Sequence, residues 1–509
     1  MSDSPKQNYE KKEAPLCTIT EGGEKSLSNS ILYLLQMGVV NIFPLISIPI
    51  ITNRLSLAEY GIFALVQVYA TIAIGIVNFG MTTGYERNYF VYEECPEKLG
   101  ALLSTVAAFV AFTTSLLILI TFLWGSKISI LLFGQEQYRE LLTLVLVSSG
   151  LTNLTNYYLF YLKNKGLAGS YSKIAISKSL LNFTFMLLLL LYFDLGLISL
   201  GYAMFGSSLI VSLFSLYRKI TDTKNILNKL LLYDVLKISL PLTPKILFGS
   251  LGTQFDKMML GMLSAFGGVA VYSIGQKISY LVFQFMTALD LVFIPGVYRR
   301  LFVGEDKEAR EDNESNLSVG SYLTPFAYIS IFFALQFVLF SEELFFLLLP
   351  ETYADGVIIV VIFSVYYANM FFGKIAGTQL IYAKKSHITS LLTLVGIVLN
   401  VSMNIPMIIK WGIYGAAWAT FISGMVMTVL FYRVAQHYIK VDWEWKPMGF
   451  MYGLIVIATI FVLVFYLDFV VAPYWIVLGC KVLIVCIYLY GGTKIGVVTR
   501  SNLSHSYLT

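Results

Sequence analysis

The sequence is poor in charge, cysteine and histidine, and each shortage excludes a class of function. Asp, Glu, Lys and Arg make up only 13% of the 509 residues, which is about half their share in soluble domains. The four cysteines and three histidines have neither a paired nor a metal-ligand spacing, so we expect no disulfide framework and no metal site. The net charge of +5 is spread along the chain, which argues against a nucleic-acid partner.

Motifs of catalysis are missing as well. The sequence has no Gly-rich lysine loop of the kind that cradles nucleotide phosphates, and no Gly-x-Ser-x-Gly turn with a nucleophilic serine. Outside the apolar runs, no stretch is long enough to bury a core of its own. We therefore expect no ATP hydrolysis, no cofactor and no large soluble catalytic domain.

Apolar side chains, in contrast, are abundant. Hydrophobic residues make up 57% of the chain, and the mean hydropathy is +0.74. A membrane-crossing helix needs about 20 mostly apolar residues, so this supply of about 290 is enough for about fourteen helices. We expect an all-α polytopic membrane protein with apolar helices at about 30–51, 60–82, 99–124, 140–162, 172–193, 196–217, 238–260, 268–295, 321–340, 355–377, 386–408, 413–432, 448–467 and 474–491.

The distribution of lysine and arginine predicts the orientation of these helices. An even number of helices places both termini on one side of the membrane, and about 25 of the 35 basic residues fall on that side. Cytosolic segments of membrane proteins are enriched in Lys and Arg. We therefore expect a cytosolic tail at 1–26 in place of a signal peptide, a cytosolic linker at 221–237 and a second cytosolic tail at 493–509.

The chain carries traces of an internal duplication. Residues 196–205 resemble 412–421, and the helices that begin there end in Tyr-Arg at Arg218 and Arg433. Chance similarity between apolar helices is the alternative. Because six helices is an even number, two copies of six share one orientation and are related by a pseudo-two-fold axis along the membrane normal. The expected units are a six-helix lobe at 27–220, a second lobe at 238–438 and two further helices at 445–492.

Several basic residues fall within the apolar runs, where a charge is costly and usually faces a cavity or a partner. Lys245, Lys257 and Lys277 lie in the seventh and eighth expected helices, and Arg87 lies at the end of the second. We interpret these four residues as the cations of a chamber that attracts anions. Arg87 fits a positive anchor at the cytosolic boundary equally well.

Two carboxylates lie in the same pair of helices. Asp256 and Asp290 are candidate sites for a coupling ion, since carboxylates at membrane depth often mark ion pathways. Each has a structural alternative. Asp256 fits an interfacial pair with Lys257, and Asp290 fits a structural salt bridge.

Prolines occur in pairs in the helices that open the two lobes. Pro44 and Pro49 lie in the first, and Pro241 and Pro244 lie in the second. A proline inside a helix removes a backbone hydrogen bond and bends the helix. Bent helices at equivalent positions of two lobes are candidate gates.

Short patterns of Gly, Pro, Tyr and charged residues recur along the chain, at 41–61, 80, 87–90, 238–242, 256–257, 271–277 and 412–417. Together they resemble the polysaccharide biosynthesis transporters, the flippases of O-antigen and capsular repeat units. The resemblance covers nearly the whole chain and extends to the superfamily of multidrug, oligosaccharidyl-lipid and polysaccharide exporters. In this sequence Lys257 stands where relatives commonly have arginine. Lysine keeps the charge but loses the bidentate contact with phosphate.

The resemblance implies a fold, a cargo and partners. It implies two lobes in a V-shaped, MATE-like arrangement that move an undecaprenyl-pyrophosphate-linked oligosaccharide, an O-antigen or capsular repeat unit, across the bacterial cytoplasmic membrane by alternating access. The implied partners are this polyprenyl-pyrophosphate-linked oligosaccharide, the lipid bilayer, an H+ or Na+ coupling ion, and a glycan polymerase with its chain-length regulator.

Two other functions remain open on the sequence alone. A multidrug exporter of the same fold would need carboxylates in its cavity, because its cargo is usually cationic. A membrane-bound polymerase or glycosyltransferase of lipid-linked sugars would need its chemistry on a sizeable outer loop. The longest expected outer loops, at about 125–139 and 341–354, are short.

Overall fold

The computed structural model describes residues 20–223, 226–303 and 318–497, which form helices and no strand. The first half of the chain contains α1 (Thr20–Arg54), α2 (Leu57–Val77), α3 (Met81–Val91), α4 (Pro96–Phe133), α5 (Arg139–Asn164), α6 (Ala168–Leu187), η1 (Leu188–Tyr192) and α7 (Ile198–Asp222). The second half contains α8 (Lys229–Leu263), α9 (Phe266–Val303), α10 (Val319–Leu339), α11 (Ser341–Leu348), η3 (Glu351–Tyr353), α12 (Gly356–Tyr382), α13 (Ser386–Tyr438), α14 (Trp445–Tyr466) and α15 (Tyr474–Lys494).

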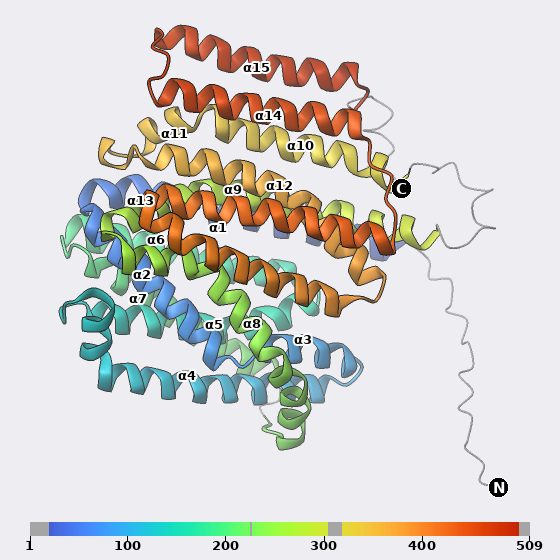
Figure 1. The fold of residues 1–509 in the computed structure, drawn as a ribbon. Helices are drawn as coiled ribbons and strands as arrows, with labels where there is room; N and C mark the ends of the chain where they lie inside the picture. The colour runs from blue at the N-terminus through green and yellow to red at the C-terminus, as the bar shows by residue number, and fades with distance from the viewer. Residues whose placement is uncertain (1–19, 224–225, 304–317, 498–509) are drawn as a thin grey trace.

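The long helices run side by side along the molecule, as Figure 1 shows. Within the described ranges, ten helices are long and apolar enough to cross a membrane by length and composition. With α2 and α3 taken as one crossing and α13 as two, the long helices make about fourteen crossings. The expected all-α fold is confirmed, and the chain is a multi-pass membrane protein.

Turns of positive φ separate helices where the sequence offers almost no loop. Gly412, with φ 56° and ψ −128°, divides the 53 residues of α13 into two helices. Glycine adopts this conformation without the steric penalty that a side chain would bring. Asp194 and Gly196, with φ of 49° and 59°, form the turn that precedes α7. Both breaks lie where the sequence predicts a boundary.

Equivalent hydrogen bonds occur in the two halves. In the first half Ser207 of α7 donates its hydroxyl to Asn182 of α6, at 3.5 Å. In the second half Asn400 and Ser423 lie on the two segments of α13, and the Asn400 amide donates to the Ser423 hydroxyl at 3.2 Å. In each half an asparagine on the fifth crossing thus contacts a serine on the sixth, as a duplication of six helices predicts.

The paired prolines lie inside α1 and α8. Pro44 leaves the carbonyl of Val40 without its helical donor, and the Ser179 hydroxyl of α6 donates to that oxygen at 3.2 Å. A freed carbonyl at membrane depth is tolerated where protein groups satisfy it, so this proline is accommodated by its neighbouring helix. The role of Pro44, Pro49, Pro241 and Pro244 as gates stays a prediction.

The two C-terminal helices are fastened to the second half. Figure 1 shows α15, α14 and α10 lying side by side. Lys481 of α15 is only 1% exposed, and its ammonium group pairs with Glu343 at 2.6 Å and Glu342 at 3.6 Å. Both carboxylates belong to α11, in a segment that the sequence predicts as a loop. This segment connects α10 with α12, and it contains a short helix that the sequence does not predict. The two acidic residues in its first turn favour a helix, and Phe345 is buried.

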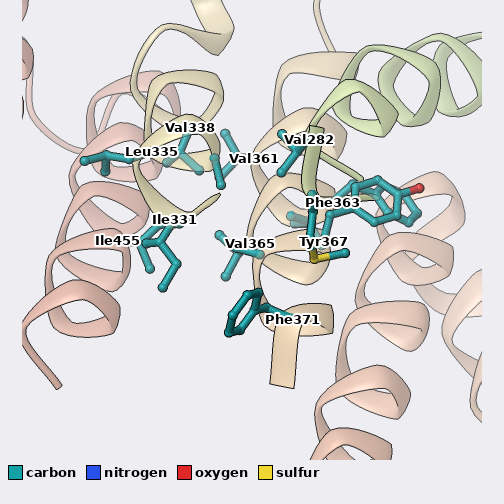
Figure 2. Close-up of a cluster of buried hydrophobic side chains, with 14 of the residues drawn as sticks. Val282, Ile331, Leu335, Val338, Val361, Phe363, Val365, Tyr367, Phe371 and Ile455 are labelled. Atoms are coloured by element: carbon teal, nitrogen blue, oxygen red, sulfur yellow. The ribbon is translucent and has the colours of Figure 1, made fainter. Parts of the chain in front are cut away.

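The largest core cluster joins α9, α10, α12 and α14. Figure 2 shows Val338 of α10 beside Val361 of α12, and Ile331 of α10 beside Ile455 of α14. The second half and the C-terminal helix pair therefore share one continuous apolar core.

The two halves meet at both ends of the bundle through glycines. Toward the end where α11 lies, Gly61 of α2 packs on α9 so closely that a Cβ there would overlap the carbonyl oxygen of Phe266. Toward the other end, a Cβ on Gly84 of α3 would overlap the Ser239 side chain of α8 and lie 2.8 Å from Val235. At each end, a helix of one half is thus closed onto a helix of the other half in near-backbone contact.

We expect Gly61→Ala to destabilise this closed arrangement, because its methyl group meets backbone atoms of α9, which cannot rotate away. Overpacking of this kind costs about 1–3 kcal/mol, and we expect a lower Tm of the purified protein in detergent. Gly453→Ala is the matched control, since a Cβ on that glycine of α14 meets nothing within 4 Å. Equal Tm values for the two variants would contradict the close contact.

Candidate transport cavity

A cavity of about 920 Å³ lies between the two halves, and neither Gly61 nor Gly84 is among its lining residues. Its wall from the first half is made by α2, with single residues of α5 and α7, and its wall from the second half by α8, α9, α12 and both segments of α13. Residues lining it include Tyr60, Gln67, Thr71, Ser149, Thr253, Asp256, Lys257, Gln276, Lys277, Tyr280, Tyr366, Tyr367, Thr393, Asn400 and Thr420.

Two of the four predicted cations line this cavity. Lys257 of α8 and Lys277 of α9 lie on its wall, and their charges interact electrostatically with each other. Neither ammonium group makes an ion pair or a hydrogen bond with any residue in the described ranges. Lys257 is half-buried and Lys277 exposes its side chain to the cavity. Lys257 is attracted electrostatically by the adjacent Asp256. Within the described ranges, an anion that enters the cavity therefore finds two ammonium groups that no ion pair or hydrogen bond occupies.

Asp256, next to Lys257 in sequence, is engaged by three donors. Its carboxylate accepts hydrogen bonds from the Tyr272 hydroxyl at 2.8 Å, the Asn404 amide at 2.7 Å and the Thr420 hydroxyl at 2.6 Å. The side chain is buried, 5% exposed. This carboxylate is thus held by neutral donors of α9 and α13, and it forms no salt bridge that would neutralise Lys257.

The groups around Asp256 have the donor set of a cation site. The Asn404 amide oxygen is buried without a hydrogen-bond partner, and the Asn400 oxygen lies one helical turn away and accepts from the Asn404 amide at 3.0 Å. Carboxylate, amide and hydroxyl oxygens are the ligands that hard cations prefer. An orphaned buried acceptor beside a carboxylate fits a small cation or a proton.

Asp290 lies outside the cavity lining and pairs with Lys374 of α12 in a short salt bridge. The same ammonium group donates to the Thr287 hydroxyl at 3.0 Å and lies 4.7 Å from the centre of the Phe283 ring. This is the arrangement of the structural alternative, a salt bridge between α9 and α12. One carboxylate oxygen of Asp290 is buried without a partner.

Of the other two predicted cations, Arg87 is described with its side chain and does not line the cavity. Arg87 lies on α3 with its side chain exposed, away from the lining residues, as its alternative role of a boundary anchor requires. Lys245 lies on α8 after Pro244, but its side chain falls outside the described residues. The structure therefore groups Lys257 with Lys277 and leaves Arg87 apart.

The charge of the cavity comes from one half only. Gln67 and Thr71 of α2 and Ser149 of α5 are the polar residues facing it from the first half besides Tyr60, and none of them is ionisable at neutral pH. Both lysines and the aspartate belong to α8 and α9 of the second half. The cavity has one charged wall and one neutral polar wall.

Sequence reasoning missed the residues that hold Asp256 and the aromatic residues of the cavity. A signal for the first was present, since Asn400 and Asn404 are four residues apart in an apolar run, and this spacing places two amides on one helix face. No signal separates Tyr280, Tyr366 and Tyr367 from the many tyrosines of the chain, because which helix face turns inward depends on packing.

The chain belongs to the family of polysaccharide biosynthesis proteins. The family described as "Polysaccharide biosynthesis protein" matches residues 26–297, which is more than half of the chain. The resemblance stated from the sequence is thereby confirmed. A search among curated proteins finds no match.

Solved structures share the fold at low sequence identity. The lipid II flippase MurJ, in an inward closed conformation, is 14% identical with a TM-score of 0.64, over 93% of this chain and 99% of that chain. An inward-facing multidrug resistance MATE transporter of the MOP superfamily is 14% identical with a TM-score of 0.62, over 81% and 97%. A MOP-superfamily transporter from Pyrococcus furiosus is 14% identical with a TM-score of 0.58, over 84% and 96%. The fold is that of MATE transporters and MurJ.

Proposed function

We propose that this protein is a flippase that moves an undecaprenyl-pyrophosphate-linked oligosaccharide, an O-antigen or capsular repeat unit, across the bacterial cytoplasmic membrane. The observation that carries the proposal is a pair of lysines, Lys257 and Lys277, which line a cavity between the two halves and form no ion pair or hydrogen bond with any described residue. A positive charge left without a partner at membrane depth is costly, so a protein that keeps two of them uses them for a ligand of opposite charge.

The sign of the cavity favours this cargo over a drug. A pyrophosphate carries about two negative charges and needs compensating cations when it leaves water. A cationic drug would meet two repelling ammonium groups, and the carboxylate of Asp256 is already engaged by three donors. The neutral polar wall with Gln67 and Thr71 suits an uncharged glycan.

The proposed mechanism is alternating access without covalent chemistry, so the protein acts as a transporter and not as an enzyme. The lobes at 27–220 and 238–438 rock about the cavity, and the contacts of Gly61 with Phe266 and of Gly84 with Ser239 separate in turn. Lys245 would receive the pyrophosphate first, and Lys257 with Lys277 would hold it in the cavity, with Arg87 as a supporting cation at the entrance.

Asp256 is the proposed site of the coupling cation. Sodium would be bound by the Asp256 carboxylate with the Thr420 hydroxyl, which already contacts it, and with the amide oxygens of Asn400 and Asn404, once the Asn404 amide nitrogen that now donates to Asp256 has turned away. A proton on Asp256 is the alternative, and Asp290 remains the second candidate for an ion site. Asp256 is adjacent to Lys257 and attracts its ammonium group. A cation bound at Asp256 would weaken this attraction and leave Lys257 available for the pyrophosphate, which would couple ion binding to cargo binding.

The first test is substitution of the proposed cavity lysines in a deletion strain. Lys245→Gln and Lys277→Gln should each reduce surface glycan by about 10- to 100-fold, since a hydrogen bond to a charged group contributes about 1.5–3 kcal/mol. Arginine at either position should retain part of the activity. Surface glycan, protein level and the lipid-linked repeat units remaining on the cytosolic face are measured.

Lys173→Gln, on the exposed surface of α6, is the control and should export normally. Normal export by both glutamine variants would refute the anionic chamber. Unchanged surface glycan with lost dye efflux in the deletion strain would favour a multidrug exporter. Short unpolymerised glycan on the cell surface would favour a polymerase.

The coupling site has a test that does not depend on transport. We expect NaCl to raise the Tm of the purified protein relative to choline chloride, because a ligand that binds only the folded state stabilises it. Asp256→Asn should abolish this difference, whereas Asp468→Asn, in the exposed turn after α14, should preserve it. Identical Tm values of the wild type in both salts would rule out the sodium site and leave the proton.

The orientation is tested by cysteine labelling in a cysteine-free background. We expect a cysteine at Lys165, in the exposed turn before α6, to react with a membrane-impermeant maleimide only after the cells are opened. A cysteine at Asp468, between α14 and α15, should react in intact cells. The reversed pattern at both positions would overturn the cytosolic placement of the termini and the direction of transport.

A further inference from the structure

A contiguous group of aromatic side chains lines the cavity on α9 and α12. Tyr280 and Phe283 of α9 stack with ring centres 5.2 Å apart, and Phe363 and Tyr367 of α12 stack at 5.8 Å. Tyr367 joins the two stacks, with its ring centre 6.0 Å from Tyr280 and 5.7 Å from Phe283, and Tyr366 lies 5.2 Å from Tyr367. We call these five residues the aromatic shelf.

The shelf lies where the apolar core borders the cavity: Phe363 and Tyr367 are buried in the core cluster, and Tyr280 is the most exposed member. Figure 2 shows Val361 and Val365 on the side of α12 that faces α10. Phe363 and Tyr367 project from the other side of α12. All five members line the cavity, and Tyr280 is 41% exposed there. An exposed ring at this depth is available for contact with a ligand.

The tyrosine hydroxyls of the shelf are free. Tyr280, Tyr366 and Tyr367 make no hydrogen bond with any residue of the described ranges. Buried tyrosines usually find a partner for the hydroxyl, as Tyr272 does with Asp256. Three unpartnered hydroxyls on one wall are available to a ligand rich in hydroxyl groups.

A glycine fixes one ring of the shelf in place. The Tyr366 ring lies against the backbone of Gly424 on α13, and a Cβ at that position would overlap the ring. The absence of a side chain at Gly424 thus leaves the space that the Tyr366 ring occupies. The shelf is a built surface with a defined ring orientation.

The shelf begins one helical turn from a proposed phosphate-binding lysine. Lys277 and Tyr280 are three residues apart on α9, and residues at this spacing lie on one helix face. Both line the same cavity. A ligand whose anionic group contacts Lys277 therefore has the Tyr280 side chain within about one helical turn of that group.

We propose that the aromatic shelf is a sugar-binding subsite, which stacks on the first sugar residues attached to the pyrophosphate and distinguishes a glycosylated lipid from bare lipid pyrophosphate. This inference rests on the proposed function and adds a second contact to it. The C–H face of a pyranose ring is apolar and packs on an aromatic face, while its hydroxyls bond to the tyrosine hydroxyls and to Gln67 and Thr71 across the cavity. Lys257 and Lys277 bind the pyrophosphate, and the aromatic shelf binds the sugars.

The test compares two probes on the full chain in nanodiscs. One is undecaprenyl pyrophosphate without sugar, and the other is the undecaprenyl-pyrophosphate-linked oligosaccharide extracted from host cells that lack this protein. Tyr280→Ala should raise the Kd for the glycosylated lipid at least about threefold, the scale of a lost aromatic contact, and leave the Kd for the bare lipid unchanged. Tyr280→Phe should retain most of the affinity, because it keeps the ring.

Two further variants guard against misfolding and general disturbance. Gly424→Ala, which keeps every aromatic residue and displaces the Tyr366 ring, should also weaken only the glycosylated probe. Tyr280→Leu keeps apolar volume without a ring and should behave as Tyr280→Ala does. Tyr192→Ala, at an exposed position of η1 outside the cavity, is the control and should bind both probes as the wild type does.

The outcomes separate the two proposals. An unchanged Kd of Tyr280→Ala and Tyr280→Leu for the glycosylated lipid, or an equal loss for both probes, would overturn the sugar subsite while leaving the flippase intact. Failure of the wild type to bind either probe, or unchanged binding of both by Lys277→Gln, would overturn the proposed function itself. Selective loss with Ala, Leu and the Gly424 variant supports the shelf.

Discussion

The cost of an unpaired polar group in a medium of low dielectric constant governs this structure. Inside the bundle Lys481 is held by Glu342 and Glu343, Asp290 by Lys374, and Asp256 by three neutral donors. Even the carbonyl of Val40 receives a hydroxyl donor from the neighbouring helix. These pairings fasten α15 to α11, α9 to α12, and α13 to α8, so the same groups that are expensive to bury also fix which helices lie together.

Lys257 and Lys277 stand out against this background, since neither has a protein partner in the described ranges although both line a cavity. Their charges, the oxygen cluster around Asp256 and the aromatic residues of α9 and α12 all belong to the second half of the chain. The first half presents Gln67, Thr71 and Ser149, which are neutral. The two halves thus differ in their cavity-facing side chains and share comparable contacts, such as those of Asn182 and Asn400.

Sequence reasoning located the long helices well because an apolar run of about 20 residues has one stable solution in a bilayer. The breaks at Asp194 and Gly412 followed from turn residues between apolar runs. The short helix α11 was missed, since eight residues with two glutamates do not form an apolar run. The two glutamates pair with the buried Lys481 of α15, a contact that the sequence does not indicate. For the site, the sequence indicated that Lys257 and Lys277 are unusual, but it did not decide between the chamber and the boundary for Arg87, which the structure places outside the cavity lining.

By itself the sequence determined the membrane class, the number and order of the helices, and the sign of the charge at membrane depth, because these depend on composition and on neighbours along the chain. Only the tertiary structure decided which charges are neutralised. Asp290 and Lys374 are 84 residues apart and meet, whereas Asp256 and Lys257 are adjacent and Asp256 bonds to α9 and α13 instead. Adjacent residues on a helix point about 100° apart, so the partner of a charged side chain is set by the helix packed opposite it and not by its neighbour in sequence.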